Sequence, residues 1–310
     1  MGIIKIRKVC NRVSCAGATV FLITLLWAIQ PANAEWVEWI ADAELGVQRN
    51  NNISQSFFES DKKSDSVFLP SVALGRYYQL MDTTRLSLTA NSWVRTHKTY
   101  DRLNSITSGI TVGVRHKFGI GPEVPWIRAD AYAGYRDVRD DVRDGMQYTM
   151  SLRMGKRFTP RLDGSLGYVY SLRDGGNGEP TMKNAMFGIS TEVFDQENQT
   201  LLLETNFLIT RDVLLTAGYS YLYGDFDSFC SAANFDAVWA VEDVKAVAVD
   251  NVFDGFVYRI RGTRTISSLN LSYALSGHAS LNLGYLYQSV KGDVLGYNSS
   301  IAQTTFMYRY

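Results

Sequence analysis

The feature that most restricts the fold of this chain is an alternation of apolar and polar residues with a period of two. In residues 37–47 the odd positions are apolar, whereas the even positions are mostly acidic or small. The segments 86–97 and 106–117 repeat this alternation. Because successive side chains of a β-strand point to opposite faces, each segment predicts a strand with one apolar and one polar face. The pattern favours an all-β fold.

A recurring Gly-Tyr pair separates a membrane barrel from a soluble β-sandwich, which would show the same alternation. In every pair the tyrosine shares the apolar face of its strand, about eight to ten residues after a predicted tight turn. A strand tilted near 40° climbs roughly 2.5 Å per residue, so these tyrosines would lie about 20 to 25 Å above the turns, near the top of a lipid-facing band. We predict that they form an outer aromatic girdle; ordinary cross-strand aromatic contacts are the alternative. The girdle residues are Tyr135, Tyr168, Tyr219 and Tyr285.

The C-terminal segment has a pattern of its own. Phe306, Tyr308 and Tyr310 share one face, and the last residue is aromatic. This segment resembles the terminal strand of outer-membrane proteins, whose closing aromatic residue is read by the barrel-insertion machinery. The resemblance implies that these three residues form an insertion signal.

Connections of two lengths alternate along the chain. Short turns are predicted around Asp82, Pro160 and His278, and longer polar stretches occur at 48–64, 98–104, 139–145, 174–180 and 292–298. Barrels of the outer membrane have short periplasmic turns and longer outside loops. The chain is therefore predicted to be a transmembrane, antiparallel, up-and-down β-barrel in the cell outer membrane, with its N-terminus in the periplasm.

The predicted number of strands is about twelve, and fourteen is the alternative. The stretch 183–210 is long for one strand, and a turn at 195–198 would divide it; splitting 256–275 as well gives fourteen. Single-chain bacterial barrels have an even number of strands. The irregular segment 225–256 is predicted to be an outside loop, which could fold inward, and an extension of its flanking strands is the alternative.

The first 34 residues carry the features of a cleaved signal peptide. Four basic residues precede an apolar run at 16–29, and Ala32-Asn33-Ala34 provides a cleavage pattern. Residues 35–310 are then the barrel domain, and Cys230 is its one cysteine. Removing the four basic residues from a total of 31 leaves 27 against 31 acidic residues, which argues against a nucleic-acid partner.

The polar faces of the predicted strands carry many charges that would line the lumen. The basic candidates are Arg85, Arg95, Arg115, Lys117, Arg128, Arg136, Arg153 and Arg157, and the acidic ones are Glu38, Asp42, Glu44 and Asp130. One interpretation is a basic stripe that favours anionic solutes. The other is that interior charges pair with each other and fill a narrow barrel. The sequence leaves both open.

No catalytic, metal or cofactor site is predicted, and the chain is not expected to be an enzyme. The three histidines, His97, His116 and His278, are scattered along the chain. His278-Ala279-Ser280 is similar to the His-x-Ser of outer-membrane phospholipases, but it falls in a predicted periplasmic turn. The glycine-rich stretch 175–178 lies between strands and not before a helix, so it is a loop.

The opening hairpin resembles that of porin-like, exopolysaccharide-associated barrels of proteobacteria. The similarity rests on Asn50-Asn51-Asn52-Ile53, Lys63-Ser64-Asp65 and Pro70, with weaker likeness at 121–126 and 143–145. It implies the barrel fold and the outer-membrane location, and it suggests surface-polysaccharide traffic. The implied partners are outer-membrane lipid, lipopolysaccharide and exopolysaccharide export components.

Three functions are compatible with these patterns. A channel for small polar solutes or a surface polymer is the leading hypothesis, because of the charged lumen. A non-conducting structural or docking barrel is the second. A surface hydrolase that depends on His97 is the third.

Overall fold

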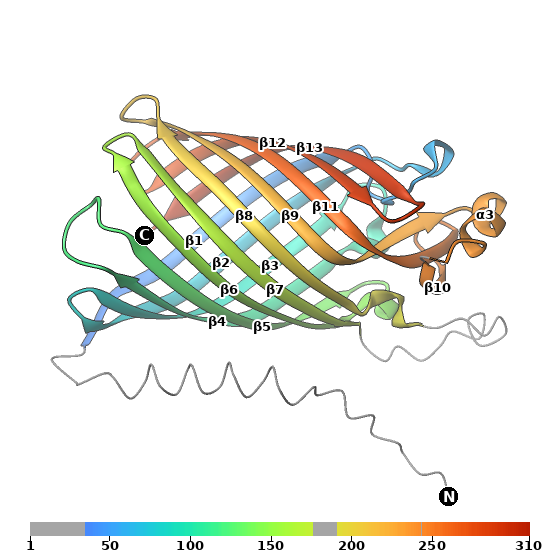
Figure 1. Ribbon diagram of the computed structural model, residues 1–310, viewed down its shortest axis with the longest axis horizontal. Coiled ribbons are helices and arrows are strands. Elements are labelled where there is room, and N and C mark those ends of the chain that lie inside the picture. Colours follow the sequence, from blue (N-terminus) through green and yellow to red (C-terminus); the bar gives the residue numbers. More distant parts are fainter. Residues whose placement is uncertain (1–34, 176–190, 243) are drawn as a thin grey trace, which may run out of the picture.

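The computed structural model describes residues 35–175, 191–242 and 244–310, and the signal peptide predicted at 1–34 lies outside them. Twelve antiparallel strands form a closed barrel, with one further strand outside it (Figure 1). The strands are β1 (Glu35–Asn50), β2 (Asp65–Met81), β3 (Thr84–His97), β4 (Ser105–Lys117), β5 (Trp126–Val138), β6 (Gly145–Thr159), β7 (Leu162–Gly175), β8 (Gln196–Leu208), β9 (Val213–Cys230), β10 (Val244–Asp250), β11 (Gly255–Ala274), β12 (Ala279–Lys291) and β13 (Gly296–Arg309).

Each barrel strand pairs with its neighbours in sequence, apart from β9, which skips β10 and pairs with β11. The ring closes between β1 and β13, where Leu45 lies opposite Phe306. The prediction of twelve strands is confirmed, and the alternative of fourteen is wrong for two reasons. Residues 255–274 form one strand, and β8 begins at Gln196, so 196–198 belong to a strand and not to a turn.

The apolar face of the barrel wall points outward. Leu74 is 61% exposed and Ile110 is 56% exposed, although both lie in the middle of strands. Such exposure would be costly in water, but it suits a surface covered by lipid. The four girdle tyrosines are also exposed, between 42% and 52%. Their position on the apolar face agrees with the alternation, whereas their role as a girdle stays a prediction.

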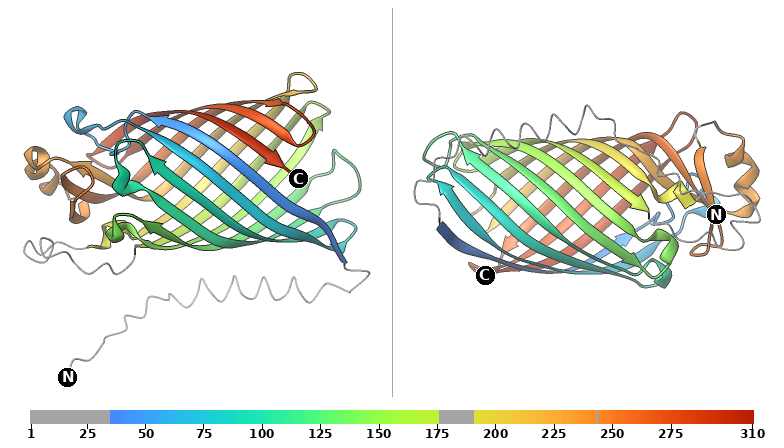
Figure 2. Two further views of the ribbon diagram at one scale, coloured as in Figure 1. Left: turned by 180° about the vertical axis from the view of Figure 1, so that it is seen from behind. Right: turned by 90° about the horizontal axis from the view of Figure 1, so that it is seen from below.

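The two ends of the barrel differ in the length of their connections (Figure 2). Short turns at 82–83, 160–161, 209–212 and 275–278 lie at one end, together with the longer connection 118–125 and the C-terminus, and we call it the turn end. Longer segments, including 51–64, 98–104, 139–144 and 231–254, lie at the other, which we call the loop end. Short turns are periplasmic in outer-membrane barrels, and this rule predicts that the loop end is the outer end.

Short helices lie in the long connections. They are η1 (Glu59–Asp61), η2 (Asp101–Leu103), η3 (Asp141–Arg143), η4 (Thr191–Phe194), η5 (Ala232–Asn234) and α3 (Phe235–Trp239). All of them lie at the loop end.

The segment from 225 to 261, which we call the cap, is not a simple outside loop as predicted. Above Gly224, β9 continues to Cys230 beside the first residues of β11, and β10 pairs with the other edge of β11. The alternative reading, an extension of the flanking strands, is therefore correct, with β10 added. This arrangement arises because β12 pairs with β11 only from Thr263 onward, which leaves the edge of 255–260 free for β10.

The cap has an ordinary hydrophobic core, unlike the barrel wall. Buried apolar residues from β9, α3, β10 and β11 pack against residues of the β12–β13 hairpin: Phe226, Cys230, Val238, Val247, Tyr258, Ile260, Val290, Leu295 and Tyr297. Burial raises the pKa of the Cys230 thiol to about 12. Cys230 is fully buried, so it is a poor probe of topology for a thiol reagent.

One glycine marks the level at which β9 leaves the barrel wall. Gly224 has a φ of 156°, and a Cβ there would lie 2.2 Å from the carbonyl oxygen of Glu197 on β8. A side chain would force the two backbones apart. Beyond this point β9 pairs with β11 and no longer with β8.

Candidate functional site

Three ion pairs between described residues lie in the turn-end half of the lumen. Arg309 Nε donates to Asp42 at 2.8 Å, and a guanidinium nitrogen of Arg128 lies 2.8 Å from Asp130. Arg85 lies 3.5 Å from Glu38. Each of these three pairs cancels its own charge within the wall, so these six residues give this half of the lumen little preference for either sign.

Arginines at the loop end follow a different pattern. Arg95, Arg136 and Arg173 lie on β3, β5 and β7, which are alternate strands of the wall. Arg95 lies opposite Ser105 of β4, and Ser105 lies opposite Val138 of β5. Arg136 is thus offset by two residues from the position on β5 that is level with Arg95.

The same offset recurs one step further along the wall. Arg136 lies opposite Gly145 of β6, and Gly145 lies opposite Gly175 of β7. Arg173 is thus offset by two residues from the position on β7 that is level with Arg136. With strands about 4.8 Å apart and a rise of about 3.3 Å per residue, successive Cα atoms in this series lie about 12 Å apart. We call these three residues the arginine row.

The arginine row has no carboxylate pairs of its own. Within the described part of the chain, none of its members forms an ion pair, and Arg173 donates instead to the backbone oxygen of Arg143 at 2.6 Å. Guanidinium groups remain charged at any physiological pH. The row therefore concentrates positive charge on one side of the mouth.

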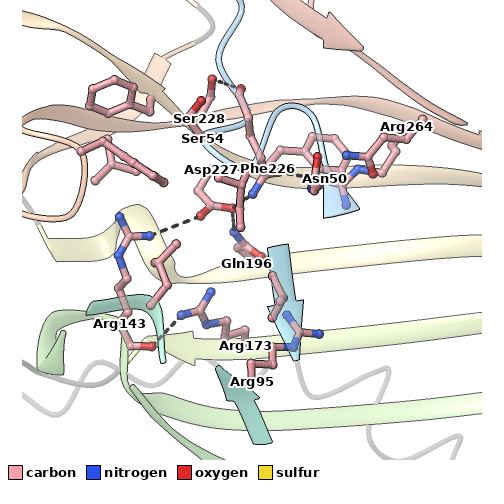
Figure 3. A pocket seen from close by; sticks show the side chains of 18 of the residues that line it. Asn50, Ser54, Arg95, Arg143, Arg173, Gln196, Phe226, Asp227, Ser228 and Arg264 are labelled. Atoms are coloured by element: carbon pink, nitrogen blue, oxygen red, sulfur yellow. Dashed lines mark hydrogen bonds and ion pairs between the residues drawn. The ribbon is translucent and has the colours of Figure 1, made fainter. Parts of the chain in front are cut away.

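The row faces a cavity of about 460 Å³ at the loop end. This volume holds roughly 15 water molecules at liquid density. Figure 3 shows Arg95 and Arg173 extending into the cavity from the wall, with Gln196 and Asp227 nearby. Apolar residues, among them Phe226 and Leu222, complete its lining.

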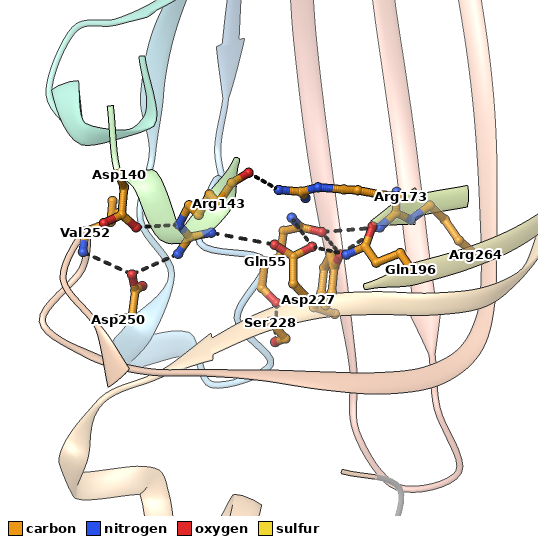
Figure 4. A network of polar contacts seen from close by, with 11 residues as sticks. Gln55, Asp140, Arg143, Arg173, Gln196, Asp227, Ser228, Asp250, Val252 and Arg264 are labelled. Carbon is orange, nitrogen blue, oxygen red and sulfur yellow. Dashed lines mark hydrogen bonds and ion pairs between the residues drawn. The ribbon is translucent and has the colours of Figure 1, made fainter. Parts of the chain in front are cut away.

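A fourth arginine in the cavity lining is fully compensated. Arg143 of η3 lies 2.8 Å from Asp250, 3.1 Å from Asp140 and 3.8 Å from Asp227 (Figure 4). Burial alone would lower the pKa of Arg143, but Asp250 and Asp227 outweigh it and raise that pKa. Arg143 therefore joins the loop after β5 to the cap, and it adds little net charge to the mouth.

The loop 51–64, between β1 and β2, folds over the mouth and into it. The side chain of Gln55 in this loop contacts residues of β9, β11 and β13. Its Oε1 accepts hydrogen bonds from Arg264 at 3.2 Å and from the hydroxyl of Tyr297. Its Nε2 donates to Asp227 at 3.5 Å, and its backbone oxygen accepts from Ser228 at 2.6 Å. The predicted outside loop is thus an inward constriction.

The same loop is fastened to the cap by Asp61. Its carboxylate accepts from the Ser231 amide at 2.8 Å and from the Asn234 side chain at 2.9 Å. Burial raises the pKa of Asp61, but these hydrogen bonds outweigh it and hold the pKa below its usual range. The clamp is therefore formed by an ionised carboxylate.

The structure distributes the predicted lumen residues over both halves. Arg95 and Arg136 line the cavity, Arg115 stacks on the Trp126 ring at 4.7 Å, and Arg153 lines a smaller pocket between β6 and β9. Lys117 and Arg157 lie near the turn ends of β4 and β6, and Glu44 lies in the middle of β1. The structure brings two of the eight predicted bases together at the mouth.

Sequence reasoning missed Arg173, Arg264 and Gln55. Arg173 has the same parity as the other polar residues of β7, so a longer predicted strand would have included it. Arg264 has the same parity as the polar residues Ser268 and Asn270 of β11, so the same rule could have identified it. Gln55 carries no sequence signal, because its role depends on a loop that crosses to strands more than 170 residues away.

The histidines do not assemble a catalytic or metal site. His97 Nδ1 lies 3.4 Å from Asp65, not beside Asp101, and His116 contacts Thr84 at 2.8 Å. His278 lies in its predicted turn, 2.9 Å from the backbone oxygen of Arg309. Among the described residues, no group of three or more His, Cys, Asp or Glu side chains could hold a metal ion.

Comparison with known proteins supports the fold and no closer relationship. No family model matches the chain, and no curated protein matches it. An outer membrane channel from Pseudomonas putida F1 aligns with a TM-score of 0.52 at 10% identity, covering 91% of this chain and 100% of that one.

Two further solved structures align less closely. The NanC porin has a TM-score of 0.45 at 12% identity, covering 86% of this chain and 98% of its own, and the KdgM porin has 0.42 at 11%, covering 87% and 99%. The protein folds as a porin-like β-barrel of the outer membrane.

Proposed function

We propose that the protein is a diffusion channel for small polar solutes that favours anions. The observation that carries this proposal is the arginine row, with three guanidinium groups and no ion pairs among the described residues, beside a cavity of about 460 Å³. Rings and rows of arginine select anions in pores because they raise the local anion concentration.

The paired charges of the turn-end half support the same direction of selectivity. Glu38, Asp42 and Asp130 are each neutralised by an arginine, so they do not oppose the row. A solute that enters from outside meets the arginine row first, before it reaches the ion pairs of the turn-end half. The proposed channel therefore sets its preference at the mouth.

Refolded residues 35–310 in planar lipid bilayers test this proposal directly. In a potassium chloride gradient we expect discrete conductance steps and a reversal potential that indicates chloride over potassium. A cation-selective pore would contradict the proposed selectivity. A barrel that inserts but never conducts would overturn the channel itself.

The second candidate is a non-conducting docking barrel, and a specific observation favours it. The loop 51–64 and the cap both lie over the mouth and are tied together through Asp61. In this function the outer surface of the cap would bind a surface polymer or an export component. Insertion without conductance, combined with binding of lipopolysaccharide or exopolysaccharide to intact cells, would support it over the channel.

A further inference from the structure

Gln55 has an unusual backbone and an unusual environment. Its φ is 55°, in the left-handed region that non-glycine residues seldom adopt, and its contacts must hold it there. Its carboxamide lies in the lumen and is surrounded by functional groups of three strands. A strained loop residue that places a polar group in a cavity is typical of a functional position.

The groups around the Gln55 carboxamide form a two-sided recognition site (Figure 4). On one side Arg264 and Tyr297 donate to the amide oxygen. On the other side Asp227 accepts from the amide nitrogen, and it also accepts from Gln196 at 3.1 Å. The site thus presents a cation and a hydroxyl to an acceptor, and a carboxylate to a donor.

We infer that Gln55 is an internal ligand of this site, which binds solutes that carry a carboxylate next to a hydroxyl group. A carboxylate oxygen suits Arg264 and Tyr297 better than an amide oxygen, because charge-assisted hydrogen bonds are stronger than neutral ones. The neighbouring hydroxyl replaces the amide nitrogen as donor to Asp227. This inference rests on the proposed channel for its biological sense, but the site itself exists whether or not the barrel conducts.

The arginine row explains how such a solute reaches the site. Arg95, Arg136 and Arg173 line the same cavity as Gln55 and Arg264, so an anion held near the row lies in the space next to the carboxamide. Displacement of the Gln55 side chain breaks its hydrogen bonds to Asp227, Arg264 and Tyr297, while the backbone bond to Ser228 and the Asp61 clamp keep the loop 51–64 attached. Binding therefore moves one side chain of the constriction and leaves the path of the loop in place.

Competition by an internal ligand has a measurable consequence. The apparent Kd of an external ligand equals its intrinsic Kd divided by the fraction of time that the site is free of the internal ligand. Gln55→Gly removes the competing side chain, and glycine adopts a φ of 55° readily, so the loop can keep its path. Gln288→Ala is the matched control, because Gln288 lines the same cavity from β12.

The test is calorimetric titration of the refolded, detergent-solubilised barrel with sodium D-gluconate, which has a carboxylate beside a hydroxyl. We expect Gln55→Gly to bind gluconate about tenfold more tightly than the wild type, and Gln288→Ala to match the wild type. Acetate, which lacks the hydroxyl, and sorbitol, which lacks the carboxylate, should each bind Gln55→Gly much more weakly than gluconate does. Equal affinity for gluconate in the wild type and Gln55→Gly would overturn the inference.

A second pair of variants tests the residues that receive the ligand. In the Gln55→Gly background, Arg264→Gln should abolish gluconate binding, and Tyr297→Phe should weaken it several-fold. Tyr297→Phe keeps the apolar packing of the ring, so it guards against a folding defect in the arginine variant. Unchanged affinity in Tyr297→Phe and in a correctly folded Arg264→Gln would contradict the site. Conductance is not used here, so failure of the channel proposal and failure of this inference are separate outcomes.

Discussion

The two halves of the lumen use similar residues in opposite ways. At the turn end, Arg85, Arg128 and Arg309 each face a carboxylate. At the loop end, the arginine row has no ion pairs among the described residues, and the carboxylates nearby are held by Arg143 and by hydrogen bonds. Under the proposed function, the selectivity of the barrel depends on the ion-pair partners of its charged residues and not on their number.

The physical basis of this difference is the origin of the neighbouring acids. The turn-end acids lie on wall strands near those of their arginines: Asp130 on the same strand, Asp42 on the adjacent strand, and Glu38 two strands away across β2. The loop-end acids come from the loop after β5, from β9 and from β10. Asp140, Asp227 and Asp250 form ion pairs with Arg143 of η3, whereas none of them forms an ion pair with the arginine row among the described residues.

The largest expected effect comes from Arg143→Gln. Its side chain is 9% exposed and that of Asp250 is fully buried, so the change leaves buried carboxylates without a cation. Breaking a buried pair in this way costs about 3 to 5 kcal/mol. We expect urea unfolding in lipid vesicles to show this loss, with the cap opening before the wall.

Arg139→Gln is the matched control in the same loop. Its pair with Asp101 is 63% and 58% exposed, so the expected loss is about 0 to 1 kcal/mol. Equal destabilisation by the two variants would show that Arg143 does not hold the cap in place.

A smaller, pH-dependent effect is expected at the Asp61 clamp. The folded-state pKa of Asp61 is lowered, so its contribution is fully present above the unfolded value of about 3.9 and is lost as the pH falls through the folded value. A fluorophore attached to Phe57→Cys should therefore become more mobile below about pH 4, which fluorescence anisotropy detects. Cys230 is buried and should not react with the label.

Asp61→Asn separates this clamp from other carboxylates of the loop end. The variant has no charge to lose at position 61, so the label should show no transition attributable to the clamp in the acid range. A transition of unchanged size would assign the effect to another group and remove Asp61 from the account.

The smallest effect is expected at the turn end. The double variant Glu38→Gln with Arg85→Gln removes one acid and one base, whose side chains are 64% and 47% exposed. We expect the reversal potential to stay unchanged and the stability to fall by less than about 1 kcal/mol. A shift in selectivity as large as that of an arginine-row variant would break the comparison between the two halves.

The barrel wall could be predicted from the sequence because its rule is local. Alternation in 37–47 and the parity of Tyr135 or Phe306 follow from residues next to each other in the chain. Twelve strands followed from counting such segments. The same parity assigned Arg95 and Arg136 to the lumen, where the cavity contains both.

The cap and the constriction could not be predicted, because they depend on contacts between distant segments. Nothing near Gln55 indicates that it meets Asp227 and Arg264. The path of β10 depends on where β12 ends its pairing with β11, and that is a property of the assembled ring. The pairing of Arg85 and Arg143 likewise depends on acidic residues of other strands.

The measurement that tests the central claim most directly is the reversal potential of the triple variant Arg95→Gln, Arg136→Gln and Arg173→Gln, compared with the wild type in the same salt gradient. These substitutions keep polar, hydrogen-bonding side chains and remove the positive charge of the row. The account predicts an anion-selective wild type and a triple variant whose preference for chloride is lost, with each single variant in between. A triple variant with the reversal potential of the wild type would contradict it, because the selectivity would then arise elsewhere in the lumen.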